Sequence, residues 1–332
     1  MPFAMPFPGS IPALAAAALA ASPTPPATDP VVPADTAIGI EALAPTAEAE
    51  LLETSSDRNL RMTVPVTIEG QGPFRFMIDT GAQATVVTRQ LGNRLGLAPA
   101  GRATVVGMAS RAPVDLVRLD GLEFAARVID NLAVPTLEAQ HIGADGILGL
   151  DSLQDLRVMI DFRQDTIAVD TAKALGGNRG YEIVVRARHR LGRLIITEAT
   201  IDGVRTEVIV DTGAQGSIGN MELMRRLKAS DREHGTTTDV HGKELSGAVD
   251  FARTLRIKDM QLSNVAIMFA DSPAFQVLGL ASKPAMILGM RDLRVFDRVA
   301  IDFHARTVLF DVPITPGYRP PRMRLNSKAT RL

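Results

Sequence analysis

Short apolar and β-branched runs, broken by turn residues, extend through most of the chain. The turn residues recur about every eight to twelve positions, which is typical of short strands. Residues 62–68 and 74–79 predict one hairpin. Residues 195–201 and 204–211 predict a second hairpin across Asp202-Gly203, a strong two-residue turn signal.

Helical patterning is brief in comparison. It covers residues 88–97 and 219–228, with further short stretches after Gly149 and Gly289. The pattern as a whole therefore predicts an all-β protein with a few short helices.

Three sequence markers occur twice, in the same order, over two segments of about a hundred residues each. The first marker is Phe76-Met77-Ile78-Asp79-Thr80-Gly81-Ala82-Gln83, repeated as Val208-Ile209-Val210-Asp211-Thr212-Gly213-Ala214-Gln215. The second is Ile147-Leu148-Gly149, repeated as Ile287-Leu288-Gly289, and the third is the segment 157–162, repeated as 298–303. This duplication predicts two similar lobes.

The repeats and the composition between them divide the chain into five parts. Residues 58–170 and 181–312 are the predicted lobes, and the glycine-containing segment 171–180 is the linker between them. Residues 1–57 are predicted to be a leader and a disordered linker. Residues 313–332 form a basic, proline-rich tail that we expect to be solvated.

The N-terminal segment resembles a secretory leader in its apolar run at residues 11–20. Ala18-Leu19-Ala20 is an acceptable small-x-small cleavage site, although no Lys or Arg precedes residue 58. These features predict a periplasmic or secreted protein, with a disordered N-terminus on a cytosolic protein as the alternative. No later run reaches the ~18 apolar residues of a membrane-spanning helix.

Composition excludes several other classes of protein. The formal net charge is −1, so the chain has no broad basic field with which to bind nucleic acid. The chain has no cysteine, which excludes disulfides, thiol nucleophiles and thiolate metal sites. Its five histidines are scattered and form no His-Glu-x-x-His pattern, so we predict no metal and no cofactor.

The repeated aspartates are the strongest candidates for chemistry, because each ends an apolar strand. Two such loops meeting across an axis would bring Asp79 and Asp211 within about 4 Å, where the repulsion is about 4 kcal/mol at an effective dielectric of 20. That energy corresponds to about three pK units, so one carboxyl stays protonated while the other is ionised. The shared proton belongs to the pair. Such a dyad can activate a water molecule for attack on a peptide carbonyl.

The residues that follow each aspartate suit a tight catalytic loop. We expect Gly81 and Gly213 to supply positive φ and close backbone approach. We expect the hydroxyls of Thr80 and Thr212 to bridge the two loops.

The doubled Asp-Thr-Gly-Ala and Ile-Leu-Gly signatures resemble those of the aspartic peptidases, particularly retropepsin-like lobes duplicated in one chain in a pepsin-like bilobal arrangement. The similarity covers residues 58–313, and it implies two acid-protease-type β-barrel lobes with the active cleft between them. It implies that Asp79 and Asp211 are catalytic and that Thr80 and Thr212 brace them. The resemblance also implies support of the catalytic loops by Gly81, Ala82, Gly213 and Ala214. It places Ile147, Leu148, Gly149, Ile287, Leu288 and Gly289 beside those loops.

The same resemblance implies hairpin flaps over the cleft. The candidates are residues 104–117 around Gly107 and Met108, and residues 237–249 around His241 and Gly242. Pepsin-like enzymes use a flap tyrosine, but neither Tyr181 nor Tyr318 lies in a candidate flap. This departure favours retropepsin-like lobes, and it leaves the flap contacts and the substrate preference open.

The leading hypothesis is therefore an aspartic endopeptidase that binds an extended polypeptide between its lobes. One alternative is a non-catalytic, bilobal peptide-binding protein. A second is a peptidase whose active site forms between chains in a homodimer, although both aspartates in one chain favour a monomer. Asp161 and Asp302 also repeat, but each lies within an alternating strand, so we interpret them as scaffolding.

Overall fold

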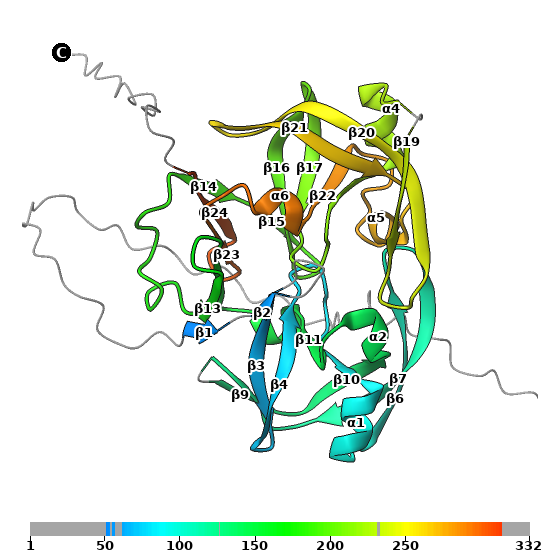
Figure 1. Ribbon diagram of the computed structural model, residues 1–332, viewed down its shortest axis with the longest axis vertical. Helices are drawn as coiled ribbons and strands as arrows, with labels where there is room; N and C mark the ends of the chain where they lie inside the picture. The colour runs from blue at the N-terminus through cyan, green and yellow to red at the C-terminus, as the bar shows by residue number, and fades with distance from the viewer. Residues whose placement is uncertain (1–50, 54, 57–61, 126, 231–232, 314–332) are drawn as a thin grey trace, which may run out of the picture.

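The computed structural model describes residues 51–53, 55–56, 62–125, 127–230 and 233–313. It contains two curled sheets and a few short helices, as the sequence predicts, and a third sheet that the sequence did not predict (Figure 1). The predicted leader with its cleavage site, and nearly all of the basic tail, lie outside the described residues. No helix in the described ranges is long and apolar enough to cross a membrane.

The first lobe is a curled sheet with three short helices. Its strands are β2 (Ser55–Ser56), β3 (Met62–Ile68), β4 (Gln71–Ile78), β5 (Val86–Thr88), β6 (Pro99–Val106), β7 (Arg111–Leu119), β8 (Leu122–Phe124), β9 (Arg127–Ile129), β10 (Leu132–Leu137) and β11 (Gly146–Leu148). Its helices are α1 (Arg89–Leu95), α2 (Ala139–Ile142) and α3 (Leu150–Leu153). The strand order is β6-β7-β10-β5-β11-β4-β3-β8-β9, with β2 paired to β3.

The second lobe repeats this plan. Its strands are β15 (Arg188–Arg190), β16 (Arg193–Ile201), β17 (Val204–Val210), β18 (Ser217–Gly219), β19 (Glu233–Thr238), β20 (Glu244–Ile257), β21 (Met260–Phe269) and β22 (Ala285–Leu288). Its helices are α4 (Met221–Leu227), α5 (Pro273–Val277) and α6 (Met290–Leu293). The order is β15-β16-β17-β22-β18-β21-β20-β19, and an added β16–β20 pairing curls the sheet onto itself.

A third sheet joins the two lobes. Its strands are β1 (Leu51–Glu53), β12 (Arg157–Asp161), β13 (Thr166–Asp170), β14 (Ile183–Arg186), β23 (Arg298–Asp302) and β24 (Thr307–Asp311). They are ordered β1-β13-β12-β23-β24-β14, so the two copies of the third marker, β12 and β23, pair antiparallel across the lobe boundary. β1 and β2 also correct the expectation that residues 51–57 are linker, because residues 51–53 and 55–56 pair as strands with β13 and β3.

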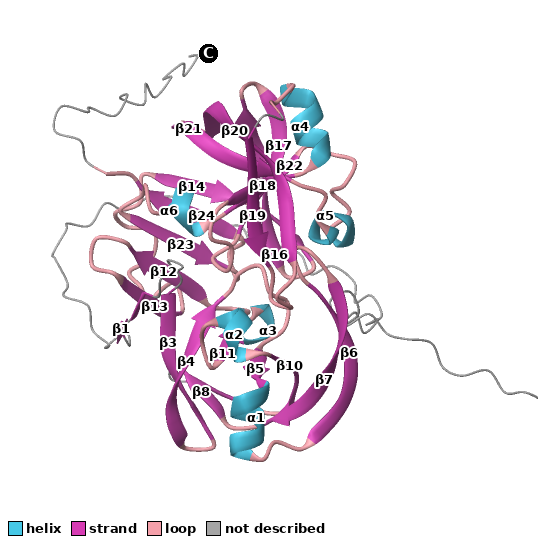
Figure 2. Cartoon of the chain, turned by 45° about the vertical axis from the view of Figure 1, so that its right-hand side comes forward, coloured by secondary structure: helices cyan, strands magenta, loops and turns pink. Residues whose placement is uncertain are grey.

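The predicted hairpins and helices are present, with shorter helices than the sequence suggested. Asp202 and Gly203 both have positive φ, as a tight hairpin turn requires. α1 is shorter because Thr88 caps it, its Oγ1 accepting from the Leu91 N–H at 3.1 Å, and Gly96 ends it with φ of 65°. α1 and α4 lie at opposite ends of the molecule, each beside its own lobe (Figure 2).

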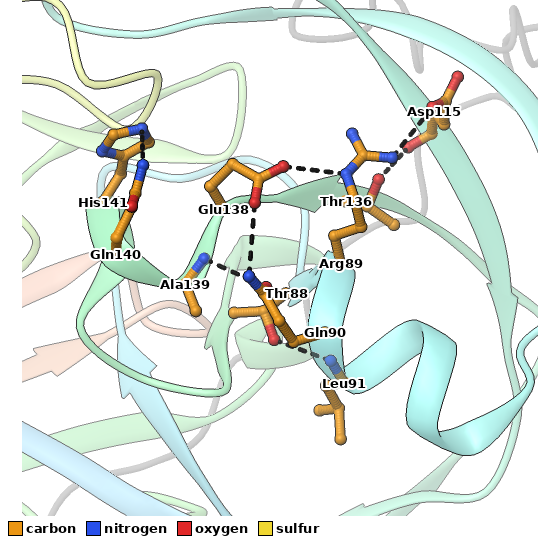
Figure 3. A network of polar contacts seen from close by, with 10 residues as sticks. All are labelled: Thr88, Arg89, Gln90, Leu91, Asp115, Thr136, Glu138, Ala139, Gln140 and His141. Atoms are coloured by element: carbon orange, nitrogen blue, oxygen red, sulfur yellow. Dashed lines mark hydrogen bonds and ion pairs between the residues drawn. The ribbon is translucent and has the colours of Figure 1, made fainter.

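A surface network ties the start of α1 to neighbouring strands (Figure 3). Arg89 pairs with Glu138 at 2.9 Å and with Asp115 of β7 at 3.3 Å. Thr136 donates its hydroxyl to the Asp115 carbonyl oxygen at 3.2 Å. These contacts link the start of α1 to the middle of β7, which belongs to the hairpin that carries the first candidate flap.

Candidate active site

The two Asp-Thr-Gly loops follow β4 and β17, and both aspartates line one cavity of about 500 Å³. β11 pairs parallel with β4, and β22 pairs parallel with β17. The Asp79 N–H donates to the Leu148 carbonyl at 3.1 Å, and the Asp211 N–H donates to the Leu288 carbonyl at 3.1 Å. Each carboxylate is therefore held where a central strand ends, at the meeting of the lobes.

The threonine hydroxyls link the two loops reciprocally. Thr80 Oγ1 donates to the Val210 carbonyl at 2.9 Å and accepts from the Thr212 N–H at 3.1 Å. Thr212 Oγ1 donates to the Ile78 carbonyl at 2.8 Å and accepts from the Thr80 N–H at 3.1 Å. Both threonines are buried, so these four hydrogen bonds hold the loops in one relative position.

The glycines are required by close approach rather than by their backbone angles. A Cβ on Gly81 would overlap the Asp211 carboxylate, and a Cβ on Gly213 would overlap the Asp79 carboxylate. Neither glycine is among the residues with positive φ, so that part of the expectation is wrong. The missing side chains leave room for each carboxylate to reach the opposite loop.

Backbone N–H groups orient both carboxylates. Asp79 Oδ1 accepts from Gly81 at 2.8 Å and from Ala82 at 3.0 Å. Asp211 Oδ1 accepts from Gly213 at 2.9 Å and from Ala214 at 3.2 Å. One oxygen of each carboxyl is thus fixed by its own loop.

The electrostatic environment favours a proton on this pair. Burial, followed by the negative charge of Asp79, raises the pKa of Asp211 to about 7, and a hydrogen bond between the two carboxyls acts in the same direction. The Gly213 N–H and the charge of Arg193 oppose this rise. Below about pH 7 the pair holds a proton, and that proton belongs to both groups.

The apolar-apolar-Gly segments pack beside the two Asp-Thr-Gly loops. Ile147 and Ile287 line the cavity, whereas Leu148 and Leu288 are buried in the core. A Cβ on Gly149 would overlap the Ala84 backbone, and one on Gly289 would overlap the Gly216 backbone. The loops and these segments therefore contact each other too closely for any residue other than glycine.

The candidate flaps are the tips of two hairpins that contact each other above the dyad. The first tip, residues 107–110, joins β6 and β7, and the second, residues 239–243, joins β19 and β20. Gly107 and Met108 line the cavity, and the Met108 carbonyl accepts from Ser272 Oγ of the second lobe at 2.6 Å. Gly242 packs against the His141 ring of the first lobe. Each tip thus rests on the opposite lobe.

Two side chains of the second tip connect it to the first. The buried Asp239 Oδ2 accepts from Ser110 Oγ at 2.7 Å and from the Ala109 N–H at 3.2 Å. His241 Nε2 lies 3.1 Å from the Val105 carbonyl oxygen, so this side chain contacts the other flap. We call the Ser110–Asp239 contact the flap latch.

Sequence reasoning missed several residues of this site. Thr85 and Ser217 hydroxyls accept from the N–H groups of Gly149 and Gly289 at 3.2 Å each. Both stand six residues after their aspartate, so their equal spacing was an available signal. Asp239 and Arg193 also line the cavity. The sequence around a polar residue at a hairpin tip or a strand end does not indicate that its side chain lines a cavity.

Two similar β lobes that each contribute a carboxylate to one cavity define a duplicated, bilobal site. The aspartyl protease family model matches the chain twice, over residues 64–152 and 197–291, which together cover more than half of its length. The chain therefore belongs to the aspartyl protease family, and a protease-type hydrolase is the activity that this family supports. A search of curated proteins finds no match.

Proposed function

We propose that this protein is an aspartic endopeptidase that hydrolyses peptide bonds with a water molecule activated by Asp79 and Asp211. The observation that carries the proposal is the presence of both carboxyls, oriented by their own loops, in one cavity of a single chain. The raised pKa of Asp211, which follows from burial and from the charge of Asp79, supports it.

The singly protonated pair supplies an acid and a base at once. The ionised carboxylate takes a proton from the water as the water oxygen attacks the peptide carbonyl carbon. The protonated carboxyl gives its proton to the carbonyl oxygen, and a later proton transfer to the amine nitrogen breaks the C–N bond. Activity should fall as pH rises through about 7, because the pair then loses its shared proton.

The cavity suits a polypeptide in extended form. It lies between the lobes beneath the two flap tips, and its wall includes both polar loops and apolar side chains such as Ile147, Met108 and Ile287. Extended peptides bind such sites through backbone hydrogen bonds, with alternate side chains in apolar pockets.

The proposal is tested by cleavage of denatured casein at pH 5 to 6 by wild type, Asp79→Asn and Asp211→Asn. Each substitution should lower kcat by about a hundredfold to ten-thousandfold, because it removes one member of the acid–base pair. Asp155→Asn is a matched control, because the Asp155 carboxylate is 76% exposed. Equal cleavage by all four proteins would refute the dyad.

An equimolar mixture of the two dyad variants separates the assembly alternatives. A site built within one chain stays inactive in the mixture. Recovered activity would show that lobes of different chains pair. Binding of casein peptides without cleavage by wild type would favour the non-catalytic peptide-binding alternative.

A further inference from the structure

One charged side chain of the active site has no part in the mechanism above. Arg193 is the first residue of β16 in the second lobe, and it lines the same cavity as Asp79 and Asp211. Only 7% of its surface is exposed. A buried guanidinium beside the proposed catalytic pair is unfavourable unless it is paired and hydrogen-bonded, because burial penalises its charge.

The contacts of Arg193 are incomplete. Its Nε donates to the Gly81 carbonyl at 2.6 Å, so the side chain reaches from the second lobe to the first catalytic loop. Its Nη1 is buried and has no hydrogen-bond partner among the residues that the structure describes. An unsatisfied buried donor costs about 1–3 kcal/mol, and an acceptor that enters the cavity would recover that energy.

The charges around Arg193 indicate what kind of acceptor fits. Burial lowers the pKa of Arg193, while the charges of Asp211 and Asp79 raise it. With one shared proton the dyad carries a single negative charge, which Arg193 balances. A neutral acceptor preserves this balance, whereas a substrate carboxylate would add an uncompensated charge.

The other charged side chains that line the cavity, among the described residues, have partners of their own. Asp239 accepts from the flap, and Arg291 donates to the Ala266 carbonyl and pairs with Asp292. Among the charged side chains of this cavity wall that the structure describes, Arg193 is therefore the one with a buried donor that has no acceptor.

We propose that Arg193 binds and positions the substrate, its Nη1 donating to a backbone carbonyl oxygen of the polypeptide while its Nε holds the Gly81 carbonyl. This inference rests on the proposed function, since it requires a polypeptide in the cavity. A backbone carbonyl is present at every residue, so the contact adds affinity without selecting a side chain.

The test compares Arg193→Met, Arg193→Lys and the control Arg188→Met, which makes the same change at an exposed position on the neighbouring strand β15. KM and kcat are measured with a fluorescein-labelled casein peptide that wild type cleaves. Affinity for the same peptide is measured by anisotropy in the Asp79→Asn background, where it is not turned over. Arg193→Met should raise KM and Kd about ten- to hundredfold, the range of a hydrogen bond to a charged group.

The pH profile separates the charge of Arg193 from its geometry. Removing the cation should raise the pKa of Asp211, so the active range of Arg193→Met should move to higher pH. Arg193→Lys keeps the charge, so its pH range should match wild type. The affinity of Arg193→Lys for the peptide should still fall, because an ammonium lacks the planar guanidinium geometry that contacts the Gly81 carbonyl and the peptide carbonyl together.

Unchanged affinity and an unchanged pH profile in Arg193→Met, with cleavage still dependent on Asp79 and Asp211, would overturn the inference and leave the peptidase intact. Loss of affinity confined to peptides that contain Asp or Glu would overturn the carbonyl assignment. If Arg193→Met does not fold, the affinity of Arg193→Lys decides. Absence of any cleavage by wild type would instead refute the proposed function.

Discussion

Carboxylates join the two lobes at several contacts, and two of these contacts differ sharply in how their charges are balanced. In the shared sheet Asp302 lies opposite Arg157 and pairs with it at 2.7 Å, both side chains being almost fully buried. At the dyad Asp211 faces Asp79, a group of the same charge. An aspartate therefore stabilises the contact between the lobes in the shared sheet, whereas two aspartates repel each other where the lobes meet at the dyad.

This difference supports assigning the proposed chemistry to the dyad. Asp302 has an oppositely charged partner, whereas burial and a like-charged partner raise the pKa of Asp211 to about 7. The shared sheet and the threonine hydrogen bonds hold the lobes together in spite of this repulsion. The structure thus has a charge-balanced contact in the shared sheet and a like-charged contact at the dyad.

The largest effect on stability should come from breaking the balanced contact. Asp302→Ala leaves the Arg157 guanidinium buried with only the Gly177 carbonyl and Asn178 Oδ1 as acceptors. The free energy of unfolding should fall by about 3–5 kcal/mol, the usual cost of removing one partner of a buried pair. Urea denaturation measures this change.

An exposed pair at the same sheet supplies the control. Arg163 binds Asp297 and Asp311, but its side chain is 52% exposed, so Arg163→Ala should cost no more than about 1 kcal/mol. Equal losses for Asp302→Ala and Arg163→Ala would remove the contrast between the two lobe contacts.

The next effect is the pH dependence that the dyad imposes on stability. The pKa of Asp211 is raised from its ordinary 3.8 to about 7, so the folded chain keeps a proton that the unfolded chain releases. Wild-type stability should therefore fall as pH rises from about 4 to about 7. Asp211→Asn removes this titration, and at pH 7 it should be more stable than wild type by about 2–4 kcal/mol.

Unfolding free energies of both proteins, measured between pH 4 and pH 8, check this sign. The variant that loses activity is expected to gain stability, which is the signature of a group retained for function. A variant that is less stable than wild type at pH 7, with the same pH slope, would show that the dyad is not strained.

The sequence predicted the two candidate catalytic loops because the signals that define them are local. Asp-Thr-Gly at a strand end, the Asp202-Gly203 turn and the apolar-apolar-Gly segments each constrain their own backbone or close neighbours, and the Asp-Thr-Gly and apolar-apolar-Gly segments occur twice. The partners of Thr80 and Thr212 were also predictable, since two loops that meet need a bridge.

The sequence could not predict which strands pair across the lobes or what Arg193 contacts. An alternating strand such as β12 shows that one face is buried, but it does not name the strand beside it. An arginine at a strand end is usually exposed, whereas this one is buried and contacts Gly81 of the other lobe, which only the tertiary structure shows. His241 is a similar case, because its contact with Val105 exists only when the flaps meet.

The flap latch is another contact between the lobes, and its carboxylate has neither a cation nor a like charge as partner. Burial raises the pKa of Asp239, but hydrogen bonds from Ser110 and from the Lys243, His241 and Ala109 N–H groups outweigh it and lower the pKa. Several neutral donors thus share the stabilisation, so the loss of any one of them should cost little.

Ser110→Ala removes one donor and leaves Asp239 bound to three backbone N–H groups. The loss should be about 1 kcal/mol and confined to the flaps, so amide hydrogen exchange at residues 107–110 should quicken about fivefold while the unfolding temperature stays unchanged. Ser246→Ala is the control, because the Ser246 hydroxyl contacts Thr236 within one hairpin. A contact that only closes the cavity can open without loosening the sheets beneath it. Equal exchange in the two variants, or a lowered unfolding temperature in Ser110→Ala, would therefore mean that the latch is part of the lobe framework.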